Sequence, residues 1–145
     1  MQTKGPFTWI QESPELQALL HDSLIGEVDH SWEDEPDYGD AIAMARQVFP
    51  ELSFLSDLVL YTFVEEACMS CGDNDWMCSL DDRPTFGTYA LARIALPPGT
   101  PLIAVAMPGS RGYKVGKFLE QQLNLTGSVE KALQVTRASL PKLMR

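Results

Sequence analysis

Three cysteines lie close together in the chain and have the spacing of thiolate metal ligands. Cys68 and Cys71 are separated by two residues, and Cys78 follows them. Thiolates at this spacing can share one zinc ion, so the group resembles half of a structural zinc site. A complete site needs a fourth ligand, and no histidine follows the cysteines, because His21 and His30 both precede them. We therefore favour free thiols of a reducing compartment over a metal site, and we expect no cofactor.

Two other catalytic interpretations of the sequence are poorly supported. A redox role for Cys68 and Cys71 is disfavoured because the pair lies at the predicted C-terminal end of a helix among several carboxylates, and both features oppose a thiolate. The run Asp29-His30-Ser31 contains the residue types of a catalytic triad, but triads do not assemble from adjacent residues. We expect that the protein is not an enzyme. A small enzyme with an unrecognised site is the alternative.

The charge of the chain divides into two unlike parts. Residues 5–82 hold 18 Asp or Glu and one basic residue, a net charge of −17, whereas residues 83–145 hold nine Lys or Arg and two Glu, a net charge of +7. The basic part could pack beside the acidic part and neutralise it within the fold. The acidic excess is larger than the basic excess, however, so an acidic surface must remain.

The densest run of carboxylates lies between residues 27 and 40, and we call it the acidic segment. Its charged and aromatic residues are Glu27, Asp29, Trp32, Glu33, Asp34, Glu35, Asp37, Tyr38 and Asp40. A solvated loop is the simplest interpretation of such a run. The alternative is a binding surface, on which the carboxylates meet a basic groove of a protein partner while Trp32 and Tyr38 act as anchors. No direct contact with nucleic acid is expected, because these carboxylates would repel it.

The spacing of apolar residues predicts a mostly α protein, a compact helical bundle of about six helices that forms a single domain over residues 1–145. With the residues that begin and end them, the predicted helices run over 13–26, 38–50, 56–72, 85–96, 110–124 and 128–140. Residues 102–107 could form a short strand or a short helix, since periodicity does not decide over so few residues.

No segment of the sequence has the length or composition of a membrane anchor. The longest apolar runs, Leu58 to Val64 and Leu102 to Met107, are too short to cross a bilayer. The first residues contain no apolar stretch of the kind found in secretory signals. We therefore expect a cytoplasmic protein that does not contact membranes.

Several short motifs resemble those of small uncharacterised proteins carried on phages and plasmids. These motifs are Phe49-Pro50-Glu51-Leu52, Ser56-Asp57-Leu58, Asn74-Asp75-Trp76, Asp81-Asp82 and the run from Phe86 to Ala95. The resemblance implies an anti-CRISPR or anti-restriction role and assigns no functional residue. Together with the charge, it gives the leading hypothesis of a stoichiometric inhibitor that binds a basic, nucleic-acid-handling protein such as a CRISPR effector or nuclease. Immunity to a basic toxin is the alternative binding function.

Overall fold

The computed structural model describes residues 3–70, 82–97, 100 and 110–145, and these residues form helices without any strand. The eight α-helices are α1 (Pro6–Glu12), α2 (Pro14–Ile25), α3 (Tyr38–Val48), α4 (Asp57–Ser70), α6 (Arg83–Ala95), α8 (Arg111–Thr126), α9 (Val129–Ala138) and α10 (Leu140–Leu143). Two 3-10 helices, η1 (His30–Asp34) and η2 (Pro50–Leu52), lie on either side of α3. The prediction of a mostly α helical bundle is confirmed.

Side-chain caps explain where the best-predicted helices begin. The hydroxyls of Ser13, Ser110 and Ser128 each accept a hydrogen bond from a backbone N–H in the first turn of α2, α8 and α9. These bonds satisfy donors that have no partner inside the helix. At the other end of α8, Gly127 adopts a left-handed backbone with φ of 64°, a conformation that favours glycine and ends the helix.

The six predicted helices correspond to α2, α3, α4, α6, α8 and α9, and the described residues add the short helices α1 and α10. The sequence analysis missed α1, α10 and the two 3-10 helices, all of which are seven residues long or shorter. Such short elements show too few inward positions for a helical period to be recognised. The question of strand or helix at residues 102–107 lies outside the described residues.

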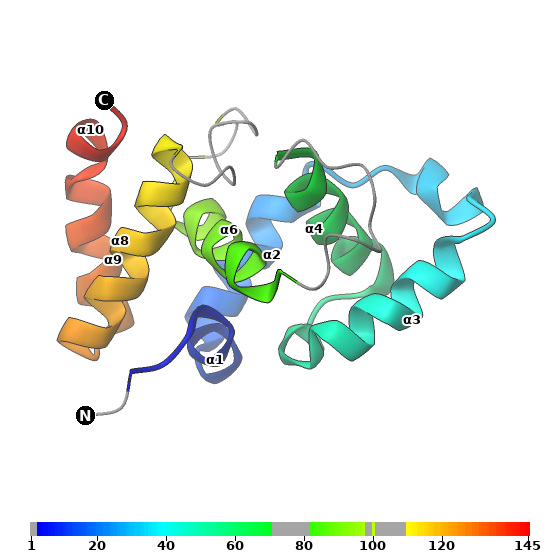
Figure 1. Cartoon of the computed structure of the whole chain (residues 1–145), viewed down its shortest axis with the longest axis horizontal. Helices are drawn as coiled ribbons and strands as arrows, with labels where there is room; N and C mark the ends of the chain where they lie inside the picture. The colour runs from blue at the N-terminus through cyan, green and yellow to red at the C-terminus, as the bar shows by residue number, and fades with distance from the viewer. Residues whose placement is uncertain (1–2, 71–81, 98–99, 101–109) are drawn as a thin grey trace.

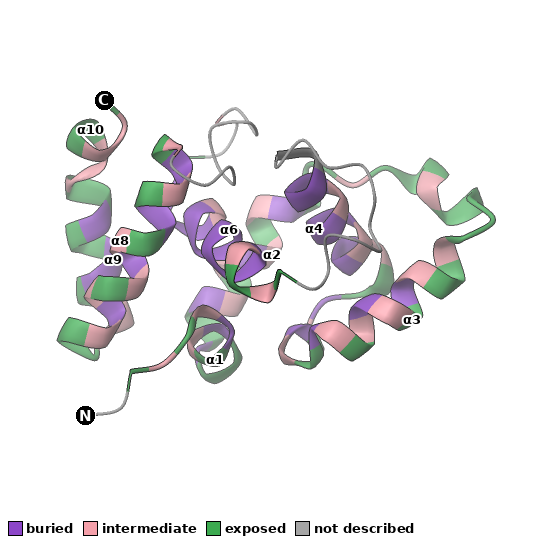
Figure 2. Ribbon diagram, viewed as in Figure 1, coloured by how far each residue is buried: buried purple, intermediate pink, exposed green. Residues whose placement is uncertain are grey.

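Helix α6 lies at the centre of the molecule and packs against α1, α2, α4, α8 and α9 (Figure 1). Every residue from Phe86 to Ala92 is buried, as Figure 2 shows. Small residues allow the neighbours to approach closely. A Cβ added at Gly116 of α8 would overlap the backbone carbonyl of Thr88 and lie 2.7 Å from its methyl group. Helices α6 and α8 therefore cross at a distance that only glycine permits.

A side chain of α8 holds the segment that precedes α1. The Asn124 side-chain oxygen accepts hydrogen bonds from the Lys4 backbone N–H at 2.8 Å and from the Trp9 indole at 3.1 Å. The Asn124 amide nitrogen donates to the Lys4 carbonyl at 3.0 Å. Both backbone groups of Lys4 are thus satisfied by one side chain from a distant helix.

The oppositely charged parts of the sequence also lie apart in space. Helix α3 and η1 occupy one end of the molecule, and α8, α9 and α10 occupy the other (Figure 1). Among the described residues, one ion pair joins the two parts, between Arg83 and Glu51 at 2.7 Å, and Arg83 belongs to the central helix α6. The basic helices at the far end therefore do not neutralise the acidic segment within the fold.

Candidate protein-binding site

The acidic segment connects α2 to α3, contains η1, and ends in the first turn of α3. All of its carboxylate residues are exposed: Glu27, Asp29, Glu33, Asp34, Glu35, Asp37 and Asp40. Figure 2 shows this end of the molecule as predominantly exposed. No Lys or Arg occurs between residues 27 and 40, so no cation within the segment reduces its charge.

Short-range hydrogen bonds give the segment its local shape. The Asp29 carboxylate accepts bonds from the Ser31 hydroxyl at 2.7 Å and the Ser31 backbone N–H at 2.9 Å, and it caps η1. These bonds to Ser31 lower the pKa of Asp29, because they stabilise its charged form. His30 lies 3.2 Å from the Glu33 carboxylate. Within the described residues, the other carboxylates of the segment make no hydrogen bond or ion pair.

The two aromatic residues of the segment pack on one ring of α4. Tyr61 lies between them, with centroid distances of 5.4 Å to Trp32 and 5.2 Å to Tyr38. Both Trp32 and Tyr38 are half-buried. The hypothesis that they anchor a partner is therefore restricted to their exposed parts, since part of each ring already fixes the segment to the fold. The sequence analysis missed Tyr61 as the residue that supports them.

Carboxylates surround this aromatic cluster, which we define as Trp32, Tyr38 and Tyr61. Burial raises the pKa of the Tyr61 hydroxyl, and Glu65 and Glu35 raise it further. The pKa of Tyr38 is likewise raised by burial, and then by nearby carboxylates. A negative field disfavours the phenolate. The same field favours cations, so the cluster offers ring faces and carboxylates together to a basic side chain.

A buried carboxylate, Glu66 on α4, lies in the neighbourhood of the segment. Glu66 is 5% exposed, and its Oε2 atom has no hydrogen-bond partner among the described residues. Burial raises the pKa of Glu66, the Glu27 carboxylate raises it further, and the guanidinium of Arg93 opposes both effects. Arg93 donates to the hydroxyl of Tyr89 at 2.9 Å and to the carbonyl of Ser23. Glu66 was expected on this helix but was not predicted as a site residue, and it follows Glu65 directly in α4.

The described residues show no metal site and no membrane helix. Among them, no three His, Cys, Asp or Glu side chains are grouped so that they could hold a metal ion. Cys68 is a buried free cysteine on α4, while Cys71 and Cys78 lie outside the described residues. No helix in the described part of the chain is long and apolar enough to cross a membrane.

Comparison with known proteins finds no relative for this chain. No family model, no curated protein and no solved structure matches it.

Proposed function

We propose that the protein is a stoichiometric inhibitor that places its acidic segment against the basic surface of a nucleic-acid-handling protein, such as a CRISPR effector or a nuclease. The observation that carries the proposal is the exposure of seven carboxylates, without a Lys or Arg among them, at one end of the molecule. Surface charge of one sign accelerates encounter with a partner of the opposite sign and disfavours wrong partners.

Charge alone would give a weak complex, because exposed ion pairs contribute about 1 kcal/mol or less each. The exposed parts of Trp32 and Tyr38 supply the contact area that ion pairs lack, since aromatic side chains dominate the energetics of many interfaces. Tyr61 supports both rings from behind, at the distances given above. The rings are therefore held in position before the partner arrives, which reduces the entropy lost on binding.

An inhibitor of this kind acts by occupying its partner's surface and needs no reaction of its own. One molecule should block one partner, so inhibition should be complete at about one equivalent when the concentrations exceed the dissociation constant. A basic toxin could bind the same surface, and the identity of the captured partner separates an anti-defence role from immunity.

The test is to capture the partner from the native host with the tagged protein, purify it, and measure association rates at increasing salt. Glu33→Lys with Asp34→Lys should slow association about tenfold at low salt, because these changes reverse the steering field. The matched control is Asp22→Lys with Glu130→Lys, which makes the same change in net charge at exposed positions of α2 and α9. Equal slowing by both pairs, or a rate independent of salt, would contradict the proposal.

A further inference from the structure

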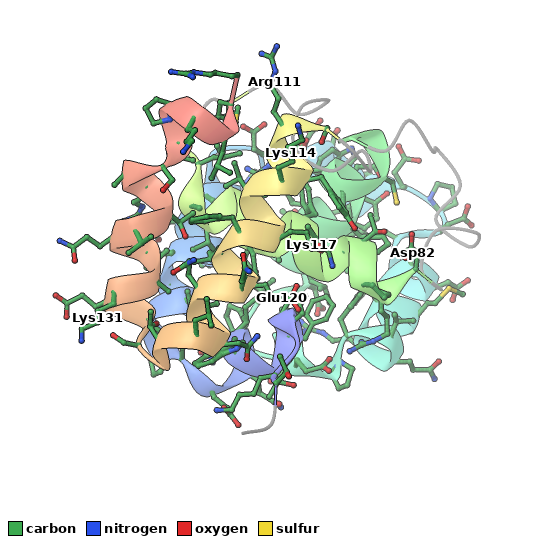
Figure 3. All side chains as sticks on the ribbon, turned by 60° about the vertical axis from the view of Figure 1, so that its left-hand side comes forward. Asp82, Arg111, Lys114, Lys117, Glu120 and Lys131 are labelled. Carbon is green, nitrogen blue, oxygen red and sulfur yellow. The ribbon has the colours of Figure 1, made fainter. Side chains whose placement is uncertain are left out.

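Helix α8 carries three exposed cations in a row on its outer side. Arg111, Lys114 and Lys117 are exposed and follow one another along the helix, as Figure 3 shows. We call them the α8 basic face. Because an α-helix rises 1.5 Å per residue, their Cα atoms are separated by about 4.5 Å along the helix axis at each step. The row is therefore continuous over roughly two turns.

Residues 110–145, which include the α8 basic face, contain little negative charge. The region from residue 110 to 145 contains seven Lys or Arg and two Glu, a net charge of +5. On α8 the acid is Glu120, whose Oε1 lies 3.8 Å from the Lys117 ammonium. Arg111 and Lys114 make no side-chain hydrogen bond or ion pair with any part of the chain that the structure describes. Two of the three cations are thus available to an external anion.

The position of these cations conflicts with the stability of the helix. Arg111 is the first residue of α8 and Lys114 follows one turn later, while the first turn contains no acid. The N-terminal end of a helix carries a partial positive charge, so cations there are destabilising and anions are favoured. A bound anion would offset this destabilisation at Arg111, which is the cation in the first turn.

A phosphate backbone fits this face better than an acidic protein does. Protein interfaces are organised around buried apolar or aromatic anchors. Among the described residues, the exposed large hydrophobic side chains Ile25, Leu125 and Val135 lie outside the row, and the half-buried Tyr113 within it already has its ring centroid 5.6 Å from the Lys117 ammonium. Contacts to phosphates need only spaced donors. Each DNA strand presents one phosphate per about 3.4 Å of helix axis, so three cations on α8 can face about three phosphates.

The net charge of −9 predicts repulsion of nucleic acid, but the two charged ends are separated in space (Figure 1). At physiological ionic strength, charges are screened over about 8 Å, so the local field at α8 differs from the field at the acidic segment. The expectation of no direct contact with nucleic acid was made for the whole protein from its carboxylates. The proposal for α8 departs from that expectation.

We propose that the α8 basic face binds the phosphate backbone of nucleic acid without base specificity. This inference does not depend on the proposed inhibitor function, which uses the opposite end of the molecule. Binding of this kind is weak, with a dissociation constant on the order of 10⁻⁴ to 10⁻⁶ M. The logarithm of the binding constant should fall with the logarithm of salt concentration with a slope of about −2 to −3, since about three counterions are released.

The test is fluorescence anisotropy of a labelled oligonucleotide, single-stranded and duplex, titrated with the full chain at low salt. Arg111→Gln with Lys114→Gln should weaken binding about tenfold or more, because two phosphate contacts are lost. The matched control, Lys131→Gln with Lys142→Gln, removes the same charge from exposed positions of α9 and α10 and should change binding less than about twofold. In Figure 3, Lys131 lies at the left of the view, away from Lys114 and Lys117 near its middle.

A second variant separates loss of binding from loss of folding. Arg111→Glu places a carboxylate in the first turn of α8, so its melting temperature should not fall while its binding to DNA weakens about tenfold or more. Equal weakening by the α8 pair and the control pair would overturn the proposal, as would undiminished binding by Arg111→Glu. Competition by poly-L-glutamate as effective as that by DNA would also overturn it and indicate an acidic protein as the partner. These results do not test the proposed inhibitor function, which the association rate of Glu33→Lys with Asp34→Lys tests separately.

Discussion

The two charged ends of the molecule are supported in different ways. At the acidic end, η1 contains no buried residue and is fixed by half-buried rings against Tyr61. At the basic end, α8 carries its cations on the outside while Val115, Leu119 and Leu123 on its inner side are completely buried. The acidic end is therefore attached mainly through its aromatic rings, whereas the basic end holds its cations at fixed spacing on a helix packed into the core. Two charged segments can thus be held in place by very different kinds of contact.

The largest effect is expected where α8 meets α6. Gly116→Ala introduces a Cβ that overlaps Thr88, so the helices must separate and the free energy of unfolding should fall by about 3 kcal/mol. Denaturation by urea measures the change. Gly39→Ala, in α3 at the acidic end, meets no atom within 4 Å and should be neutral or stabilising. Similar losses for both variants would show that the two ends do not differ in packing.

A smaller effect is expected at the aromatic cluster of the acidic end. Trp32→Ala removes the ring that packs on Tyr61 and should cost about 2 kcal/mol of partner affinity. Amide hydrogen exchange should become faster at residues 30–34 and stay unchanged in α8, because only the local structure is loosened. Trp32→Phe keeps a ring and should retain most of the affinity. If Trp32→Ala lowers the melting temperature but leaves affinity intact, the ring is structural and the contact lies elsewhere.

The smallest effect is expected at Glu66, between the two ends. Its raised pKa means that the folded state holds the proton more tightly than the unfolded state, so this contribution to stability is complete at acidic pH and is lost as pH rises through the folded pKa. Glu66→Gln should therefore match the wild type in acid and exceed its unfolding free energy by about 1 kcal/mol above that pKa.

Unfolding curves across pH, with Glu130→Gln as the control for net charge, measure this difference. Glu130 is exposed on α9, so its replacement removes the same charge without affecting a buried group. A Glu66→Gln variant that is less stable at neutral pH would show that the attraction of Arg93 outweighs the cost of burial.

The fold could be predicted where local signals agree over several turns. Ser13, Ser110 and Ser128 mark helix starts, and the apolar spacing that follows each of them continues far enough to fix the period. In α1 only Phe7 and Ile10 are buried, and two positions do not define a period. The mostly α class was therefore predictable, while the complete set of helices was not.

The candidate site was predictable only in part, because its support comes from distant residues. The exposure of the carboxylates follows from their density between residues 27 and 40. The contact of Trp32 and Tyr38 with Tyr61 depends on how α3 packs on α4, which no local pattern contains. The separation of the charged ends likewise depends on the order of helices around α6. The sequence shows that its two parts carry opposite charge, but not that these parts lie at opposite ends of the fold.

The Asn124 side chain, which holds Lys4 and Trp9, has a consequence for the order of folding. Its hydrogen bond to the Lys4 backbone joins residues 120 positions apart in the chain. Closing a loop of this length costs conformational entropy, and the hydrogen bond offsets that cost only after it has formed. The ribosome also synthesises Asn124 long after Trp9. The hydrogen bonds that hold the segment before α1 can therefore form only after α8 has been made. Docking of this segment is a late step, and it closes the chain upon itself.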